Sequence, residues 1–147
     1  MVSERLKRTL WVVFFSILTF AYLDQTPKFI EQRENIFVFL WFFCIALIAL
    51  MYYVFRKDKS ESLAIFITGS ILLFAGAEDL LFFTIFHIQG KAVDFCVNHS
   101  LDVLPFMSFA DLKILGNSCV TYGGLFVNVA IGSIVAYFVS KKLIEEY

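Results

Sequence analysis

Four apolar segments, separated by short polar stretches, dominate the pattern along the chain: residues 9–23, 36–55, 63–88 and 118–140. A helix needs about 20 apolar residues to cross a hydrocarbon core about 30 Å thick, so the last three segments are long enough. The first reaches this length if Leu6 joins it while Lys7 and Arg8 extend their side chains toward the headgroups. No A-x-A-like site follows, so we expect a retained helix rather than a cleaved signal peptide.

The composition agrees with long apolar helices. Hydrophobic residues make up 60% of the 147 residues and charged residues 17%, with a mean hydropathy of +0.80. Ordinary soluble domains carry about 25% charge, so this composition excludes a disordered chain and argues against a soluble domain. The net charge of −1 gives no general reason to bind nucleic acid. The sequence therefore predicts an all-α integral membrane protein in contact with the lipid bilayer.

The basic residues predict the orientation of the four helices. One side of the membrane would carry eight of them: Arg5, Lys7, Arg8, Arg56, Lys57, Lys59, Lys141 and Lys142. The other side would carry Lys28, Arg33, Lys91 and Lys113. Because cytoplasmic loops are enriched in Lys and Arg, both termini and the loop over residues 56–61 are expected in the cytoplasm.

Short connections favour antiparallel neighbours, so residues 1–147 are predicted to form a single domain, an up-down bundle of four transmembrane helices. The outer segment between helices three and four is longer. In it, Pro105 at a first helical position and Gly116 just past the end frame a helix of about 11 residues. That helix is too short to span, and we expect it to be interfacial or re-entrant.

The strongest candidate site is an acidic pair, Glu78 and Asp79, within the third apolar segment. The pair lies about ten residues, or about 15 Å, below the outer end of helix three and so close to the middle of the bilayer. No Lys, Arg or His is expected at a comparable depth. Ionised carboxylates inside a membrane are costly, which points to binding of a proton, of a small cation or of a positive group on another molecule. Two neutral acids could instead form hydrogen bonds between helices.

Asn128 is expected at a similar depth, and Ser16 and Cys44 only slightly shallower, so these residues could form one polar layer with the acids. Helix four also carries a stripe of small and polar residues at every fourth position: Gly124, Asn128, Gly132, Ala136 and Ser140. Such stripes allow close helix packing. Asn128 should therefore face another helix, in this chain or in a second copy, with helix three as the favoured neighbour.

The outer loop offers a second candidate site. His87, His99 and Asp102 carry nitrogen and oxygen ligands that suit a divalent metal such as zinc. They would lie too far from the acidic pair to share one ion with it in a regular helix. Cys96 and Cys119 flank the predicted outer helix and could form a disulfide or remain free. Asn98 begins an N-x-[ST] pattern, which alone is weak evidence of glycosylation.

No serine-hydrolase, nucleotide-binding or thiol-redox motif occurs in the sequence, so no catalytic residue is assigned. Three hypotheses remain. The first is a small membrane protein whose acidic pair binds a proton or cation, with coupled transport by a homo-oligomer. The second is a non-enzymatic subunit or assembly factor of a larger membrane complex, whose acids pair with a partner helix. The third is a membrane-embedded, metal-dependent hydrolase acting on a lipid or headgroup.

Overall fold

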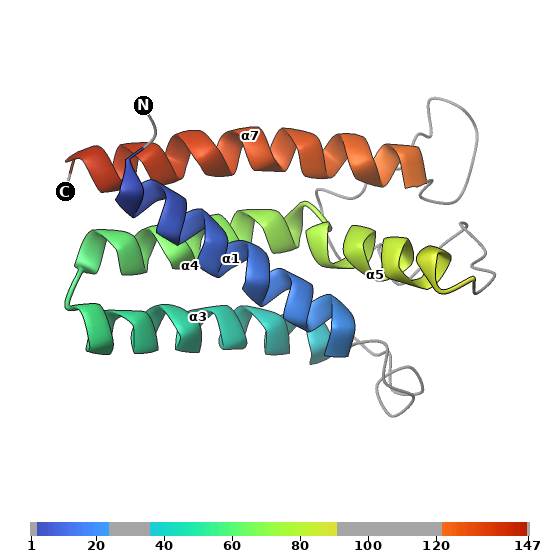
Figure 1. Ribbon diagram of the computed structural model, residues 1–147, viewed down its shortest axis with the longest axis horizontal. Helices are drawn as coiled ribbons and strands as arrows, with labels where there is room; N and C mark the ends of the chain where they lie inside the picture. Colours follow the sequence, from blue (N-terminus) through green and yellow to red (C-terminus); the bar gives the residue numbers. More distant parts are fainter. Residues whose placement is uncertain (1–2, 24–35, 91–121, 147) are drawn as a thin grey trace.

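In a computed structural model, the protein is all-helical over the residues described, which are 3–23, 36–90 and 122–146. Five helices occupy these ranges (Figure 1): α1 (Glu4–Leu23), α3 (Ile36–Arg56), α4 (Lys59–Phe74), α5 (Ala77–Ile88) and α7 (Tyr122–Glu146). The predicted outer helix from Pro105, together with Cys96, Asn98, His99, Asp102 and Cys119, lies outside the described residues.

Two helices are long and apolar enough to cross a membrane: α1 and the Gly124–Glu146 part of α7. The bent pair α4 and α5 would form a third span, and Leu40–Arg56 of α3 is a shorter apolar helix. The α1 helix starts at Glu4, so Leu6 does join the first apolar segment. The loop expected over residues 56–61 is much shorter than predicted, because α4 already begins at Lys59.

The α4 helix is the centre of the assembly and packs against α1, α3 and α7. Phe20 of α1 stacks on Trp41 of α3, with ring centroids 4.6 Å apart. Ile45 of α3 lies close to Gly69 of α4, where an added Cβ would come within 2.8 Å of the Ile45 side chain. These contacts bury a continuous apolar core between α1, α3 and α4.

Both chain termini and the α3–α4 connection lie at one end of the molecule, whereas α5 points toward the opposite end (Figure 1). Many large apolar side chains remain exposed on the outside, among them Phe43 on α3 and Phe138 on α7. An exposed apolar surface of this kind is what lipid contact requires.

Candidate functional site

The third apolar segment is broken rather than regular. The α4 helix ends at Phe74, α5 begins at Ala77, and their axes differ by 63°. Gly76 connects them in a left-handed conformation with φ of 80°, which glycine adopts without a steric cost. The expectation of one continuous helix over residues 63–88 is therefore wrong.

The acidic pair lies immediately after this break. Glu78 and Asp79 occupy the first turn of α5, where a helix has backbone N–H groups without intrahelical acceptors and a positive dipole end. Glu78 is only 8% exposed, and Asp79 is partly buried. The break thus gives the two carboxyl groups a more favourable electrostatic setting than the middle of a continuous helix would.

Asn128 of α7 contacts the break directly. Its Nδ2 atom donates a hydrogen bond to the backbone oxygen of Ala75 at 3.0 Å. Because a helix end leaves backbone carbonyl groups without intrahelical donors, this bond satisfies a polar group that would otherwise be costly in an apolar setting. Of the neighbours expected for Asn128, the structure thus shows the favoured one, helix three of the same chain, whereas a role of Asn128 in binding an ion stays a prediction.

Gly132, one turn further along α7, explains why the two segments meet at this point. A Cβ added to Gly132 would come within 2.5 Å of the Ala75 Cβ, so only glycine permits this approach. Ala136 and Ser140 of the same stripe are also buried. The small-residue stripe therefore packs inside this chain, where α7 meets α4.

A cavity of about 210 Å³ lies beside this contact, between α4 and α7. Its walls are apolar except for Asn128, whose side chain lines it together with Phe74 and Ile131. The hydrogen bond from Asn128 to the Ala75 carbonyl thus borders an open space next to the break.

The other members of the predicted polar layer have local roles. Ser16 is buried on α1 and donates from Oγ to the backbone oxygen of Val12 at 2.7 Å, a bond within its own helix. Cys44 is a free, partly buried thiol that packs against the apolar core. That either residue joins the acidic pair stays a prediction.

The metal hypothesis concerns residues that are mostly outside the described part. His87 is exposed near the C-terminal end of α5, but His99 and Asp102 are not described. Among residues 3–23, 36–90 and 122–146, no group of three or more His, Cys, Asp or Glu side chains could hold a metal ion. A site built from His87 and the outer loop stays a prediction.

At the opposite end of α4, the structure contains a charged cluster that the sequence analysis missed. Glu61 is 1% exposed, and its Oε1 atom accepts from Arg5 Nε at 3.2 Å and from Arg8 Nη2 at 2.7 Å. The hydroxyl of Tyr52 on α3 donates to the second oxygen, Oε2. One carboxylate thus connects α1, α3 and α4.

Asp58 completes this cluster. Its Oδ1 atom accepts from the backbone N–H of Glu61 at 3.0 Å and so caps the N-terminus of α4. Both of its oxygens accept from Arg5 Nη2, at 2.8 and 2.7 Å. Arg5 Nη1 also donates to the backbone oxygen of Ile144 at 3.3 Å, which adds the last turn of α7. Two arginines and two acids therefore form a neutral clamp across four helices.

The clamp changes the acidity of Asp58. Burial raises the pKa of this carboxyl, but hydrogen bonds from the Glu61 backbone and the Arg5 guanidinium stabilise the carboxylate more strongly. The pKa of Asp58 is lowered as a result.

A sequence feature could have revealed this cluster. Asp58 and Glu61 have the spacing of a capping box, in which an N-cap residue is followed three positions later by Glu before an apolar run. The bond from Glu61 N to Asp58 forms half of that motif, while the Glu61 side chain binds the arginines.

Comparison of the sequence with family models found no match, and comparisons with curated proteins and with solved structures found none either.

Proposed function

We propose that this protein is a polytopic membrane protein in which Glu78 and Asp79 bind a proton or a small cation at the break between α4 and α5. The observation that carries the proposal is the burial of Glu78, 8% exposed, within an apolar bent span. Acidic side chains at membrane depth are rare and usually serve ion or proton pathways.

The chemistry follows from the cost of burying charge. Transferring an ionised carboxylate into an apolar medium is expensive, and a bound proton or cation removes that cost. A break in a membrane helix also exposes backbone N–H and carbonyl groups, which many transporters use to bind substrates and ions. In this site Asn128 holds the Ala75 carbonyl, and so it fixes the geometry around the acidic pair.

The proposed membrane arrangement has four crossings, with both termini in the cytoplasm. The α1 helix, the α4–α5 pair and α7 provide three apolar spans, and α3 provides the fourth. Transport would then run between a cytoplasmic side near the charged clamp and an outer entrance formed by His87 and Asp102. Four short helices enclose little volume, so we propose that a homo-oligomer forms the complete pathway.

The test is proton flux in liposomes that contain the purified full chain and a trapped pH-sensitive dye. Glu78→Gln and Asp79→Asn should each slow the dissipation of an imposed pH gradient, because an amide cannot release and rebind a proton. Glu145→Gln is the matched control, since Glu145 is exposed near the end of α7. Flux that is unchanged in both test variants would contradict proton transport.

The same variants separate transport from an assembly role. If flux is unchanged but a larger membrane complex dissociates when Glu78 or Asp79 becomes an amide, the acids pair with a partner's basic group. Replacement of sodium by a large organic cation in the same liposomes would distinguish a small-cation site from a proton site.

A further inference from the structure

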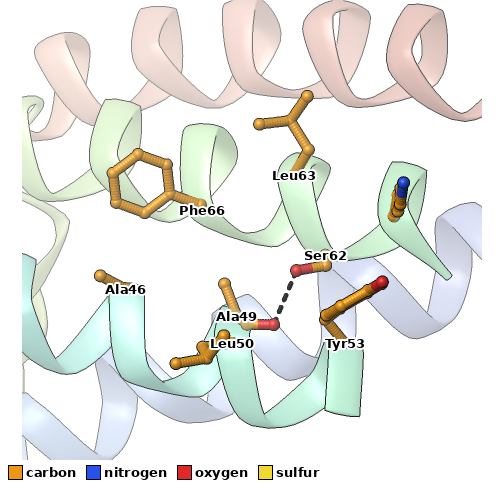
Figure 2. Close-up of a pocket in the computed structure, with 8 residues that line it drawn as sticks. Ala46, Ala49, Leu50, Tyr53, Ser62, Leu63 and Phe66 are labelled. Carbon is orange, nitrogen blue, oxygen red and sulfur yellow. Dashed lines mark hydrogen bonds between the residues drawn. The ribbon is translucent and has the colours of Figure 1, made fainter. Parts of the chain in front are cut away.

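A groove between α3 and α4 is distinct from the break and from the charged clamp. It has a volume of about 470 Å³, which lies within the range of small-molecule sites. Figure 2 shows Ala46 and Leu50 on one wall and Leu63 and Phe66 on the other. The groove therefore offers a mostly apolar surface between the two helices.

Most of the residues that line the groove are apolar. The Ser62 hydroxyl is satisfied within the helix pair, since it donates to the backbone oxygen of Ala49 at 2.6 Å (Figure 2). Ala46 and Ala49 have the smallest side chains of the lining, so the space between the helices remains open. Such a lining suits a hydrocarbon chain and gives a polar ligand few hydrogen bonds.

One end of the groove is positively charged. Lys59 belongs to its lining, and so does Tyr53, over whose ring the Lys57 ammonium lies 6.0 Å from the centroid. The nearest acids along the chain, Asp58 and Glu61, bind Arg5 and Arg8 inside the clamp. Within the described ranges Lys57 and Lys59 form no ion pair with an acid. Lys59 thus brings a positive charge without a described acid partner to the groove lining, and Lys57 lies over the ring of a second lining residue.

We propose that this groove binds an anionic phospholipid of the cytoplasmic leaflet, with an acyl chain between α3 and α4 and the phosphate at Lys59 and Lys57. The arrangement matches the amphiphile, because a mostly apolar lining includes Lys59 and Tyr53, and the Lys57 ammonium lies over the Tyr53 ring. Basic pockets between membrane helices on the cytoplasmic side commonly bind acidic lipid headgroups. The choice of leaflet rests on the proposed membrane orientation, but the inference does not depend on the proposed function of Glu78.

The experiment is native mass spectrometry of the purified full chain in a nonionic detergent, titrated with phosphatidylglycerol or with phosphatidylcholine of the same acyl chains. We expect one phosphatidylglycerol to be retained at concentrations where phosphatidylcholine is lost. Lys59→Gln should weaken phosphatidylglycerol binding about fivefold, because one lysine near an acidic lipid contributes about that much.

Two further variants make the outcome decisive. Lys142→Gln is the control, because Lys142 is exposed on α7 outside the groove lining, and binding should not change. Ala46→Leu fills the groove and should weaken the binding of both phosphatidylglycerol and phosphatidylcholine. If Lys59→Gln and Lys142→Gln weaken phosphatidylglycerol binding equally, the proposal is overturned, because the lipid would then respond to the general surface charge of the protein. Equal affinity of the parent chain for the two lipids would overturn its anionic selectivity.

Discussion

Glu61 is the most buried charged residue of the described chain, and it accepts hydrogen bonds from three side chains. Glu61→Gln would remove the negative charge that opposes Arg5 and Arg8. We expect the free energy of unfolding to fall by about 1–3 kcal/mol, less than for a fully buried pair because both arginines are partly exposed and can be hydrated. A denaturant titration in detergent micelles, followed by circular dichroism, would measure the change.

Glu146→Gln provides the matched comparison for this experiment. Glu146 is an exposed acid, 3.8 Å from Lys142 on the same helix. Exposed pairs of this kind stabilise proteins by less than about 1 kcal/mol, so the free energy of unfolding should barely change. Similar losses in the two variants would contradict a stabilising role for the buried clamp.

Asp58 should give the protein a specific sensitivity to acid. Its pKa is lowered below the ordinary value of 3.8, so it stabilises the folded state fully above that pH and loses this contribution as the pH falls toward the folded pKa. In Asp58→Asn, which keeps a good N-cap, this contribution is absent. The difference in melting temperature between the parent and the variant should be largest near neutral pH and shrink below about pH 4. A difference independent of pH would contradict the lowered pKa.

Which residues could be predicted depended on whether a local pattern determined their contacts. Asn128 lies on a regular small-residue stripe, and that spacing was enough to predict that it faces another helix, with helix three as the favoured neighbour. Two of the three partners of Glu61, Arg5 and Arg8, lie more than 50 positions away along the chain. They belong to a helix whose rotation the sequence does not determine. Arg5 and Arg8 belong to the excess of basic residues that predicts orientation, and only the packing of the helices shows that they also bind acids.

The contact between α7 and the break is limited by the size of two side chains. Gly132→Ala would place a methyl group 2.5 Å from the Ala75 Cβ, which must move. Overpacking of this kind costs about 1–3 kcal/mol and outweighs the gain of about 1 kcal/mol that alanine brings to a helix. We expect Gly132→Ala to lower the free energy of unfolding measured in the same titration.

A second substitution shows whether the loss comes from this one contact. Ala75→Gly removes the methyl group that collides, so the double variant Gly132→Ala with Ala75→Gly should recover most of the lost stability. Ser133→Ala, at an exposed position next to Gly132, serves as the control for helix propensity. If the double variant is less stable than Gly132→Ala alone, the predicted contact does not limit packing.

The helices themselves were largely predictable, but the break was not. Apolar runs of suitable length indicated α1, α3 and α7, with differences mainly at their ends. Hydropathy does not register a change of backbone direction, so a continuous apolar segment concealed the turn at Gly76. The 63° bend follows from one left-handed residue and from packing against Asn128 and Gly132, which depends on contacts between distant segments.

At the scale of the whole molecule, the described residues include two groups of buried acids, which lie at different levels and have different roles. The clamp at the end that carries both termini is electrically balanced and connects four helices. Glu78 and Asp79 lie beyond the other end of α4, directly after the break. A stable anchor at one end leaves the α4–α5 break as the place where binding of a proton or cation could alter the helices without separating the bundle.

The same end also determines the orientation that we expect in the membrane. Even with Arg5 and Arg8 bound to acids, six exposed basic residues remain there: Lys7, Arg56, Lys57, Lys59, Lys141 and Lys142. An excess of Lys and Arg keeps short segments in the cytoplasm, and nearby acids change this preference little. Both termini and the α3–α4 connection should therefore face the cytoplasm, with the C-terminal end of α5 outside.

Cysteine labelling in intact expressing cells tests this orientation. In a chain whose Cys44, Cys96 and Cys119 are replaced by serine, Gln89→Cys should react with a membrane-impermeant maleimide, because Gln89 is exposed beyond the end of α5. Arg56→Cys and Lys142→Cys should react only after the membrane is permeabilised, since they lie at the end that carries both termini. Labelling of Arg56→Cys and Lys142→Cys from opposite sides would contradict the up-down arrangement. Reversal of all three results would contradict the cytoplasmic placement of both termini.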